Sequence, residues 1–278
     1  MKRKEIKIMD LKTIASNVRV GIITEVAAAQ SGHPGGSLSS ADIVTYLYFE
    51  AMNINKDNLD DPNRDKFILS KGHASPVLYA ALAEKGIIER DELKTFRKIN
   101  TRLQGHPAIH KCPGVDMTAG SLGLGFPVAV GLALGNKIDG KDSTVYCLCG
   151  DGEIQEGSIW EAAMAASHYK LDNLILYVDN NNLQIDGPIT DVMSPYPIDE
   201  KFAAFGFNVI NVEDGHDFDQ LREANEKAKA CKGKPSVIVC KTVKGKGVSF
   251  MENQVGWHGK APSEEQAKEA IEELGGWK

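Results

Sequence analysis

The sequence predicts an α/β protein with a mostly parallel, doubly wound sheet that carries helices on both faces. Short β-branched runs alternate along the chain with longer amphipathic segments, which is the order of βαβ units. Three of these runs, at 144–149, 174–179 and 236–241, are apolar without strict alternation, as expected for strands buried on both faces. The chain has no internal repeat and no Pro/Ser-rich linker, so we expect one domain over 1–278 with irregular N- and C-terminal extensions.

The elements can be assigned in order from the same patterns. Strands are expected at 66–70, 144–149, 174–179, 207–212 and 236–241. Helices are expected at 14–30, 41–52, 76–85, 127–137, 158–169 and 218–230. Ser39-x-x-Asp42 resembles a capping box at the start of the second helix. The acidic segment 263–274 is predicted to be a solvated surface helix, with docking of a partner as the alternative.

Composition and charge narrow the classes of partner. The formal net charge is −6 and no block of Lys/Arg could follow a phosphate backbone, which disfavours nucleic-acid binding. The most apolar stretch, 122–134, is too short and glycine-rich to span a bilayer, and residues 1–10 lack the apolar centre of a secretory signal. Five cysteines form no CxxC pair, so they are expected to be free thiols of a reduced, cytoplasmic protein: Cys112, Cys147, Cys149, Cys231 and Cys240.

Histidine occurs beside glycine more often than chance predicts. Four of the seven histidines directly follow glycine and a fifth, His258, precedes Gly259, whereas about one Gly-His pair is expected at this composition. Glycine lets a ligand approach closely, and imidazole can bond phosphate or hydroxyl oxygens or move a proton near neutral pH. We therefore select His33, His73, His106 and His258 as candidate site residues. His216, His110 and His168 are interpreted as ordinary surface or core histidines.

The strongest local signal stands at the ends of two predicted strands. The run 144–149 leads into Gly150-Asp151-Gly152-Glu153, and the run 174–179 leads into Asn180-Asn181-Asn182-Leu183. One helix lies between them, so Asp151 and Asn181 should project from adjacent carboxyl ends of one βαβ unit. A carboxylate, an amide oxygen and a backbone carbonyl become an octahedral Mg²⁺ site once two phosphate oxygens and a water join them. The pattern thus indicates Mg²⁺ that arrives with a diphosphate.

A family resemblance follows from these residues. The segment from Gly150 to Asn182 resembles the thiamine diphosphate motif, which begins with GDG and ends with NN. The other motifs resemble transketolase, in that family's order and over nearly the whole chain. They are SGHPGGSLSSADI (31–43), ILSKGHASPVLYAAL (68–82), GHP (105–107), TAGSLGLG (118–125), GDGEIQEGSIWEAA (150–163), DNNNLQIDGP (179–188) and WHGKAP (257–262).

The resemblance implies the fold of the diphosphate-binding domain, two cofactors and a role for each site residue. It implies that Asp151, Asn181 and the carbonyl of Leu183 bind Mg²⁺. Thiamine diphosphate would be contacted by residues from several motifs: His73, Gly120, Leu122, Gly150, Asp151, Gly152, Glu156, Asn181 and His258. The 244–247 loop is expected to close over the diphosphate.

The histidines and one glutamate have further implied roles. His73 and His258 would lie near the reacting carbons, and His33 and His106 would face the C1 end of the sugar. His33 with His258 would assist proton transfer from the donor's hydroxyl. Glu156 resembles the glutamate that forms hydrogen bonds across the dimer interface between active sites. Ser121 and Leu124 replace the proline and glutamine of the family's GPLGQG, which affects the detail of that loop.

Half of the family's site is not visible in this sequence. In transketolases the glutamate that activates the aminopyrimidine ring and the arginines that bind the sugar phosphate belong to the next domain. We therefore expect an N-terminal subunit that is inactive alone and pairs with a C-terminal, pyrimidine-binding subunit, as a dimer of heterodimers. The complex would transfer a two-carbon unit between sugar phosphates in the pentose phosphate pathway.

Two alternatives remain open at the level of sequence. One is half of another thiamine diphosphate enzyme, such as a deoxyxylulose-phosphate synthase or a transketolase for an unusual sugar. His33 and His106 together favour a ketose donor, because pyruvate has no C1 hydroxyl to bind. The other is a module that binds the cofactor without turnover, which the sugar-facing histidines disfavour.

Overall fold

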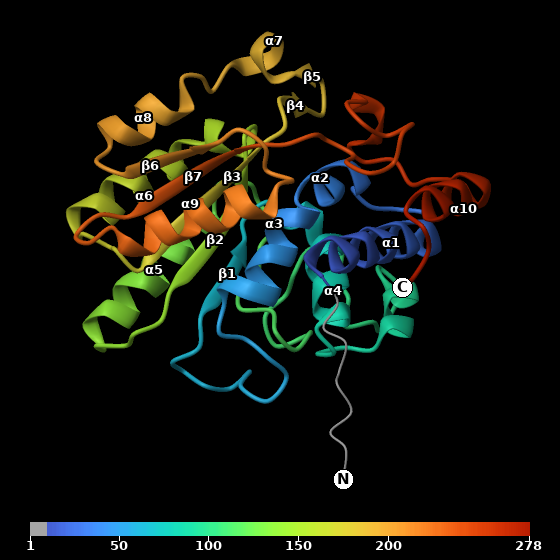
Figure 1. The fold of residues 1–278 in the computed structure, drawn as a ribbon, viewed down its shortest axis with the longest axis horizontal. Coiled ribbons are helices and arrows are strands. Elements are labelled where there is room, and N and C mark those ends of the chain that lie inside the picture. The colour runs from blue at the N-terminus through green and yellow to red at the C-terminus, as the bar shows by residue number, and fades with distance from the viewer. Residues whose placement is uncertain (1–9) are drawn as a thin grey trace.

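The computed structural model describes residues 10–278, so the expectation for residues 1–10 falls almost entirely outside the described part. Its sheet has five parallel strands in the order β1-β2-β3-β7-β6 (Figure 1). They span Lys66–Leu69 (β1), Val145–Gly150 (β2), Leu174–Asn180 (β3), Asn208–Val212 (β6) and Ser236–Lys241 (β7). All five predicted strands are confirmed within one residue at each end.

Helices cover both faces of this sheet, as predicted (Figure 1). The core on one face is formed with α3 (Ala41–Tyr46), α4 (Ser75–Glu84) and α9 (Phe218–Ala230), and α1 (Leu11–Ala29) packs on α3 and α4. The other face packs against α5 (Gly125–Ile138), α6 (Gly157–His168) and α8 (Ile198–Ala204). The order of the elements is that of a doubly wound α/β fold, and the predicted fold class is confirmed.

Several short elements complete the chain. They are α2 (Pro34–Ser39), α7 (Ile189–Met193), α10 (Glu264–Glu273), the hairpin β4 (Leu183–Gln184) with β5 (Gly187–Pro188), and single helical turns at Leu47–Ala51, Gly72–Ala74, Arg90–Thr95, Glu153–Gln155 and Val255–Trp257. The α10 helix confirms the amphipathic helix predicted near the C-terminus. Its buried Ala267 and Ala270 belong to the same core as α1, and Ser263 caps it in a capping box with Gln266.

The capping box predicted for Ser39 and Asp42 is wrong. The Ser39 hydroxyl donates to the Asp179 carboxylate over 2.6 Å, and the Asp42 carboxylate pairs with Arg19. Both side chains are buried, and Ser40 instead precedes α3 without a side-chain cap. Partners from distant parts of the chain therefore take these side chains away from the local role. The 41–52 helix also changes to a π-helical turn at Leu47.

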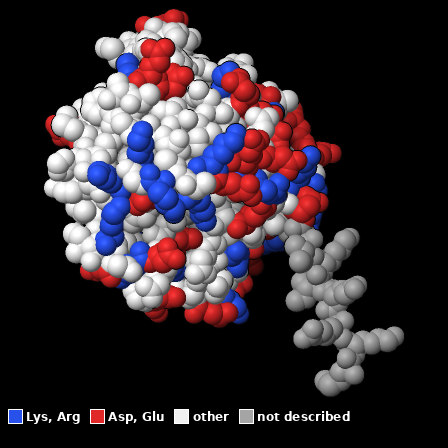
Figure 2. Space-filling model, turned by 60° about the vertical axis from the view of Figure 1, so that its left-hand side comes forward, with Lys and Arg blue, Asp and Glu red and all other residues white. Residues whose placement is uncertain are grey.

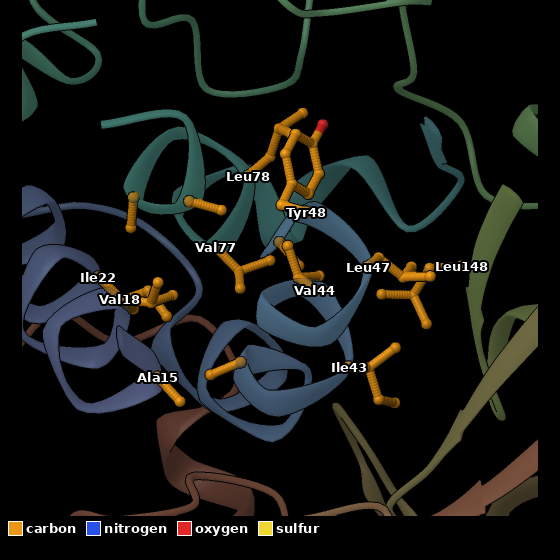
Figure 3. Close-up of a cluster of buried hydrophobic side chains, with 14 of the residues drawn as sticks. Ala15, Val18, Ile22, Ile43, Val44, Leu47, Tyr48, Val77, Leu78 and Leu148 are labelled. Atoms are coloured by element: carbon orange, nitrogen blue, oxygen red, sulfur yellow. The ribbon is translucent and has the colours of Figure 1, made fainter. Parts of the chain in front are cut away.

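The larger core joins α1, α3 and α4 to one face of the sheet. Figure 3 shows side chains of these helices pointing toward one another, with Leu148 of β2 at the edge of the cluster. Burying one such aliphatic side chain contributes about 1.5–3 kcal/mol. The labelled residues are Ala15, Val18, Ile22, Ile43, Val44, Leu47, Tyr48, Val77, Leu78 and Leu148. The short helix α2 contacts α3 and α4 of this core, and its Ser39 donates to Asp179 on β3.

The surface carries both signs of charge. On the face in Figure 2, lysine and arginine side chains gather near the centre, and acidic side chains lie mainly to their right and at the top. Among residues 10–278, no helix combines the length and the apolar character needed to cross a bilayer. All five cysteines are free, and four are buried while Cys231 is partly exposed.

Candidate functional site

A cavity of about 390 Å³ lies at the carboxyl ends of β1, β2 and β3, where parallel sheets of this type bind ligands. Every residue selected from the sequence lines it. These are His33, His73, His106, Gly120, Leu122, Gly150, Asp151, Gly152, Glu156, Asn181, Leu183 and His258. Tertiary structure thus brings together segments that lie far apart in the sequence. His110, His168 and His216 lie outside this cavity.

Three of the histidines form one cluster inside this cavity. The ring centroids of His33 and His73 are 5.1 Å apart, those of His33 and His258 5.5 Å, and those of His73 and His258 5.4 Å. Burial, followed by nearby positive charges, lowers the pKa of His33 to about 4 and that of His258 to about 3, and holds that of His73 well below its usual range. All three are therefore neutral near pH 7, each with one N–H donor and one acceptor nitrogen.

The fourth histidine, His106, stands at the rim. His106 is exposed at the surface, but neighbouring residues shield part of its ring from water, and this desolvation together with the charge of Arg97 lowers its pKa. The Nδ1 atom of His33 is buried and has no hydrogen-bond partner among the described residues. This buried nitrogen therefore has hydrogen-bonding capacity that the described residues do not use.

Asp151 and Asn181 lie where the sequence predicts them, at adjacent strand ends. The strands β2 and β3 pair in parallel, and the Asp151 N–H donates to the Asp179 carbonyl over 3.2 Å. The Asp151 carboxylate accepts the N–H groups of Gly152 (2.9 Å) and Asn182 (2.6 Å). Burial, followed by the negative charge of Asp179, raises the pKa of Asp151 to about 7. Within residues 10–278, no positive side chain is in direct contact with this carboxylate to compensate its charge.

Lys244 supplies a positive charge that the sequence analysis did not assign. Its loop was expected over the diphosphate, but not its side chain inside the cavity. The ammonium donates to the carbonyl of Leu183 over 2.8 Å and to Nδ1 of His258 over 3.0 Å. Burial lowers its pKa to about 8, although Asp151 acts in the opposite direction. The contact with His258 leaves Nε2 as the protonated nitrogen of that neutral ring.

A buried ion pair beneath the cavity was also missed. The Lys71 ammonium contacts the Asp179 carboxylate over 2.5 Å and the Gly36 carbonyl over 2.8 Å. Asp179 also accepts from Ser39, Ser40, Asn181 and Thr242. Burial alone would raise the pKa of Asp179, but Lys71 and these hydrogen bonds lower it to about 2. Both residues lie inside motifs quoted from the sequence, and only the pairing was invisible there.

Two glutamates near the GDG turn differ in environment. Glu153 is buried and accepts from the Ser70 hydroxyl (2.5 Å) and from the N–H groups of Gly123 (3.0 Å) and Gly150 (3.1 Å). It therefore ties the turn after β2 to the 121–124 loop. Glu156 lines the cavity and is exposed, as is Leu122. Its exposure is compatible with the interface role implied by the resemblance.

The donor set fits Mg²⁺ with a diphosphate better than it fits a metal held by protein alone. In residues 10–278, three or more His, Cys, Asp or Glu side chains do not gather around any common metal position. Asp151 provides one carboxylate, and the Asn181 amide and the Leu183 carbonyl provide neutral oxygens. Hard oxygens of this number leave coordination positions for phosphate oxygens. The Lys244 ammonium adds positive charge for an anionic ligand.

Comparisons with known proteins agree with this geometry. Residues 11–278 match the family model described as transketolase, thiamine diphosphate binding domain. The chain is 43% identical over 266 residues to the 6-deoxy-6-sulfo-D-fructose transketolase subunit of a Clostridium species, covering 96% of each. It is 42% identical to an apulose-4-phosphate transketolase subunit of Actinobacillus succinogenes, covering 91% of each.

Transketolases of the longer type match over only part of their length. The human transketolase is 42% identical, and the match covers 96% of this chain and 42% of the human protein. The structure of transketolase from Leishmania mexicana superposes with a TM-score of 0.90 at 34% identity, over 96% of this chain and 42% of that one. This chain thus spans less than half the length of these relatives.

Proposed function

We propose that this chain, which belongs to the thiamine diphosphate binding domain family of transketolases, is the cofactor-binding subunit of a two-chain transketolase. The observation that supports this most directly is the single cavity that holds Asp151, Asn181 and Leu183 beside His33, His73 and His258. Oxygen atoms suited to bind Mg²⁺ and neutral imidazoles lie together there, at the carboxyl ends of the strands. A cofactor-binding site and a sugar-facing site therefore share one space.

In this proposal the protein oxygens hold Mg²⁺ and the backbone of the GDG turn holds the diphosphate. Asp151, Asn181 and the carbonyl of Leu183 are the metal ligands, and Lys244 adds positive charge next to them. Gly152, Gly120 and Leu122 line the space for the cofactor. Thiamine diphosphate, when bound, supplies the nucleophilic carbon for two-carbon transfer.

The histidines would position the sugar and move its protons. The neutral ring of His33 lines the cavity, where it can accept a hydrogen bond from a hydroxyl of the donor sugar or donate one to it. His258, protonated on Nε2, can donate to a developing oxygen anion. Since neutral imidazoles can take up a proton as well as donate one, His33 and His258 suit the proton transfer that accompanies cleavage of the donor.

A second chain is part of the proposal. The relatives covered along nearly their whole length are named as subunits, and their names imply partners. The cavity lining also includes two exposed apolar side chains, Leu122 and Ile185, which another chain could cover. We propose that the partner supplies the pyrimidine-activating glutamate and that two such pairs form a dimer of heterodimers, with Glu156 near the interface.

The relatives favour a specialised sugar over the general pentose phosphate reaction expected from the sequence. Two of them are named for 6-deoxy-6-sulfo-D-fructose and for apulose 4-phosphate. Both names describe a ketose with an anionic group, a sulfonate or a phosphate. We therefore propose a ketose donor of this class, with xylulose 5-phosphate as the general transketolase donor to compare.

The test uses the purified chain with and without a candidate partner that carries the pyrimidine-binding glutamate. The mixture, supplied with Mg²⁺ and thiamine diphosphate, is assayed with three ketose donors. Ribose 5-phosphate is the acceptor for xylulose 5-phosphate, because cleavage of that donor itself releases glyceraldehyde 3-phosphate, and glyceraldehyde 3-phosphate is the acceptor for the other two. The donors are 6-deoxy-6-sulfo-D-fructose, apulose 4-phosphate and xylulose 5-phosphate. We expect turnover in the mixture and none with either chain alone.

Other outcomes would replace the proposal. Turnover by the isolated chain would contradict the two-chain assignment. Product formation with pyruvate as donor, but with no ketose, would indicate a deoxyxylulose-phosphate synthase type of reaction. Saturable cofactor binding by the mixture without turnover of any donor would indicate a module that only binds the cofactor.

A further inference from the structure

His216 lies outside the cavity but contacts the loop that carries Lys244. Its side chain is 11% exposed, in the turn that follows β6. The Gly215 N–H anchors this turn by donating to the Lys241 carbonyl over 2.7 Å. The sequence interpretation of His216 as an ordinary surface or core histidine does not account for the two polar contacts that its ring makes.

The two ring nitrogens of His216 have distinct partners. Nε2 accepts the N–H of Val243 over 2.9 Å, and Nδ1 lies 2.6 Å from the Asp42 carboxylate. Because a backbone N–H can only donate, Nε2 must carry the lone pair. Nδ1 then carries the proton and donates it to Asp42. The structure therefore fixes one tautomer of His216.

Asp42 connects His216 to a second contact with the same loop. The Asp42 carboxylate also accepts from the guanidinium of Arg19, and Nε of Arg19 donates to the Lys246 carbonyl over 3.0 Å. Arg19 and Asp42 are buried, at 7% and 4% exposure. The cluster Arg19–Asp42–His216 thus forms hydrogen bonds to the loop on both sides of Lys244, at Val243 and at Lys246. We call these three residues the loop clamp.

The loop between these contacts has little freedom. The N–H of Gly245 donates to the Gly35 carbonyl over 3.0 Å, and the Lys244 carbonyl accepts from Asn253 over 2.9 Å. Gly245 has φ +79°, and a Cβ there would lie 2.3 Å from the Met251 carbonyl oxygen. The backbone around Lys244 is therefore held by hydrogen bonds to four residues: His216, Arg19, Gly35 and Asn253. The contact of His216 is made to Val243, the residue directly before Lys244.

We propose that His216 is a positioning residue, which holds the Val243 N–H so that the Lys244 ammonium faces the bound diphosphate. The inference rests on the proposed function, because it needs Lys244 to meet an anionic cofactor. His216 itself touches neither the cofactor cavity nor its metal ligands. Its effect passes through one backbone hydrogen bond, whose loss changes a local equilibrium by about two- to tenfold.

Two substitutions of similar size test the roles of Nδ1 and Nε2 of His216 separately. In His216→Gln the side-chain oxygen can reach the place of Nε2 and accept from Val243. In His216→Asn the shorter amide can replace only Nδ1, so it keeps a donor toward Asp42 and leaves the Val243 N–H without a partner. Two quantities are measured: hydrogen exchange of the Val243 amide in the purified chain without cofactor, and the Kd of thiamine diphosphate at saturating Mg²⁺ for its complex with the partner.

We expect His216→Asn to speed exchange at Val243 and to weaken cofactor binding, each by about two- to tenfold. His216→Gln should recover most of both properties. If His216→Asn does not fold, His216→Ser replaces it, because a short side chain also leaves the Val243 N–H without its acceptor while the Arg19–Asp42 ion pair stays intact. Equal behaviour of the Asn and Gln variants, whether both match the wild type or both lose binding, would overturn the inference.

Failure of the proposed function gives a different result. A wild-type chain that shows no saturable binding of thiamine diphosphate with Mg²⁺, alone or with its partner, contradicts the proposed function itself. The hydrogen exchange rate of the Val243 amide would then be the only test of the loop clamp, and an unchanged rate in His216→Asn would overturn the role of His216.

Discussion

Two carboxylates at neighbouring strand ends, Asp179 and Asp151, have opposite environments. Asp179 on β3 contacts the Lys71 ammonium and accepts hydrogen bonds from four further side chains, which lowers its pKa to about 2 despite burial. Asp151 after β2 accepts only from backbone N–H groups of Gly152 and Asn182, and burial with the charge of Asp179 raises its pKa to about 7.

This difference distinguishes Asp179, a carboxylate that is neutralised within the fold, from Asp151, a carboxylate that remains available to a ligand. The partners of Asp179 include Lys71 just after β1, Ser39 in α2 and Thr242 just after β7, so its contacts tie the strand ends to α2. Asp151 has no such neutralisation among the described residues and faces the cavity. A divalent cation would complete the environment of Asp151 but not that of Asp179.

Neutralising Asp179 should have the largest effect on folding. In Asp179→Asn the Lys71 ammonium stays buried without its counter-charge, which should lower the free energy of unfolding by about 3–5 kcal/mol. Urea denaturation measures this, with the exposed Asp57→Asn as a control expected within about 0.5 kcal/mol of wild type. A loss below about 1 kcal/mol would mean that Asp179 is not the anchor described here.

Removing Asp151 should affect binding rather than folding. Asp151→Ala should weaken Mg²⁺-dependent binding of thiamine diphosphate by at least about 100-fold, more than the loss of an outer-shell partner costs. Its stability without cofactor should be equal or higher, because a buried acid next to Asp179 disappears. Calorimetric titration of the complex compares it with Asp186→Ala, an exposed residue of the β4–β5 connection. Unchanged titration would refute the ligand assignment.

Glu25 on α1 extends the comparison to a carboxyl group with no partner. Both of its oxygens are buried and unbonded within residues 10–278, and burial raises its pKa well above the usual range. As the pH rises above 4.5, the unfolded chain releases this proton before the folded chain does, so the folded state loses stability. Glu25→Met removes this cost.

The stability gain of Glu25→Met over wild type should therefore grow with pH, by up to about 1.4 kcal/mol per pH unit between pH 5 and pH 8. Urea denaturation at several pH values measures the slope. A gain that is the same at both ends of this range would show that Glu25 is ionised or partnered in the folded protein.

The smallest effect is expected from a single partner of Asp179. Ser39→Ala removes the 2.6 Å hydrogen bond to that carboxylate but leaves the Lys71 contact, and should cost about 1 kcal/mol. Thermal unfolding in the same buffer as Asp179→Asn gives the comparison. An effect as large as that of Asp179→Asn would mean that Ser39 has a further role, for example in the position of α2.

Some of the site could be predicted and some could not. The GDG turn after one buried strand and the NNN turn after the next indicated Asp151 and Asn181 because parallel strands place their ends together. The Lys71–Asp179 pair joins residues 108 positions apart, and a lysine or aspartate by itself gives no sign that it is buried. The side chain of Lys244 was missed for the same reason, although its loop was expected at the cavity.

The local patterns of the chain determined the five strands and the main helices, because hydrophobic period and glycine placement act over a few residues. They also indicated Asp151, Asn181 and the histidines of the cavity, and the resemblance to transketolases supplied the other predicted lining residues. Tertiary structure alone decided which charges are neutralised. It gave Ser39 and Asp42 distant partners in place of a helix cap, and it placed His216 against the Lys244 loop. Burial and distance set the charge state of each group, and both depend on which segments the fold brings together.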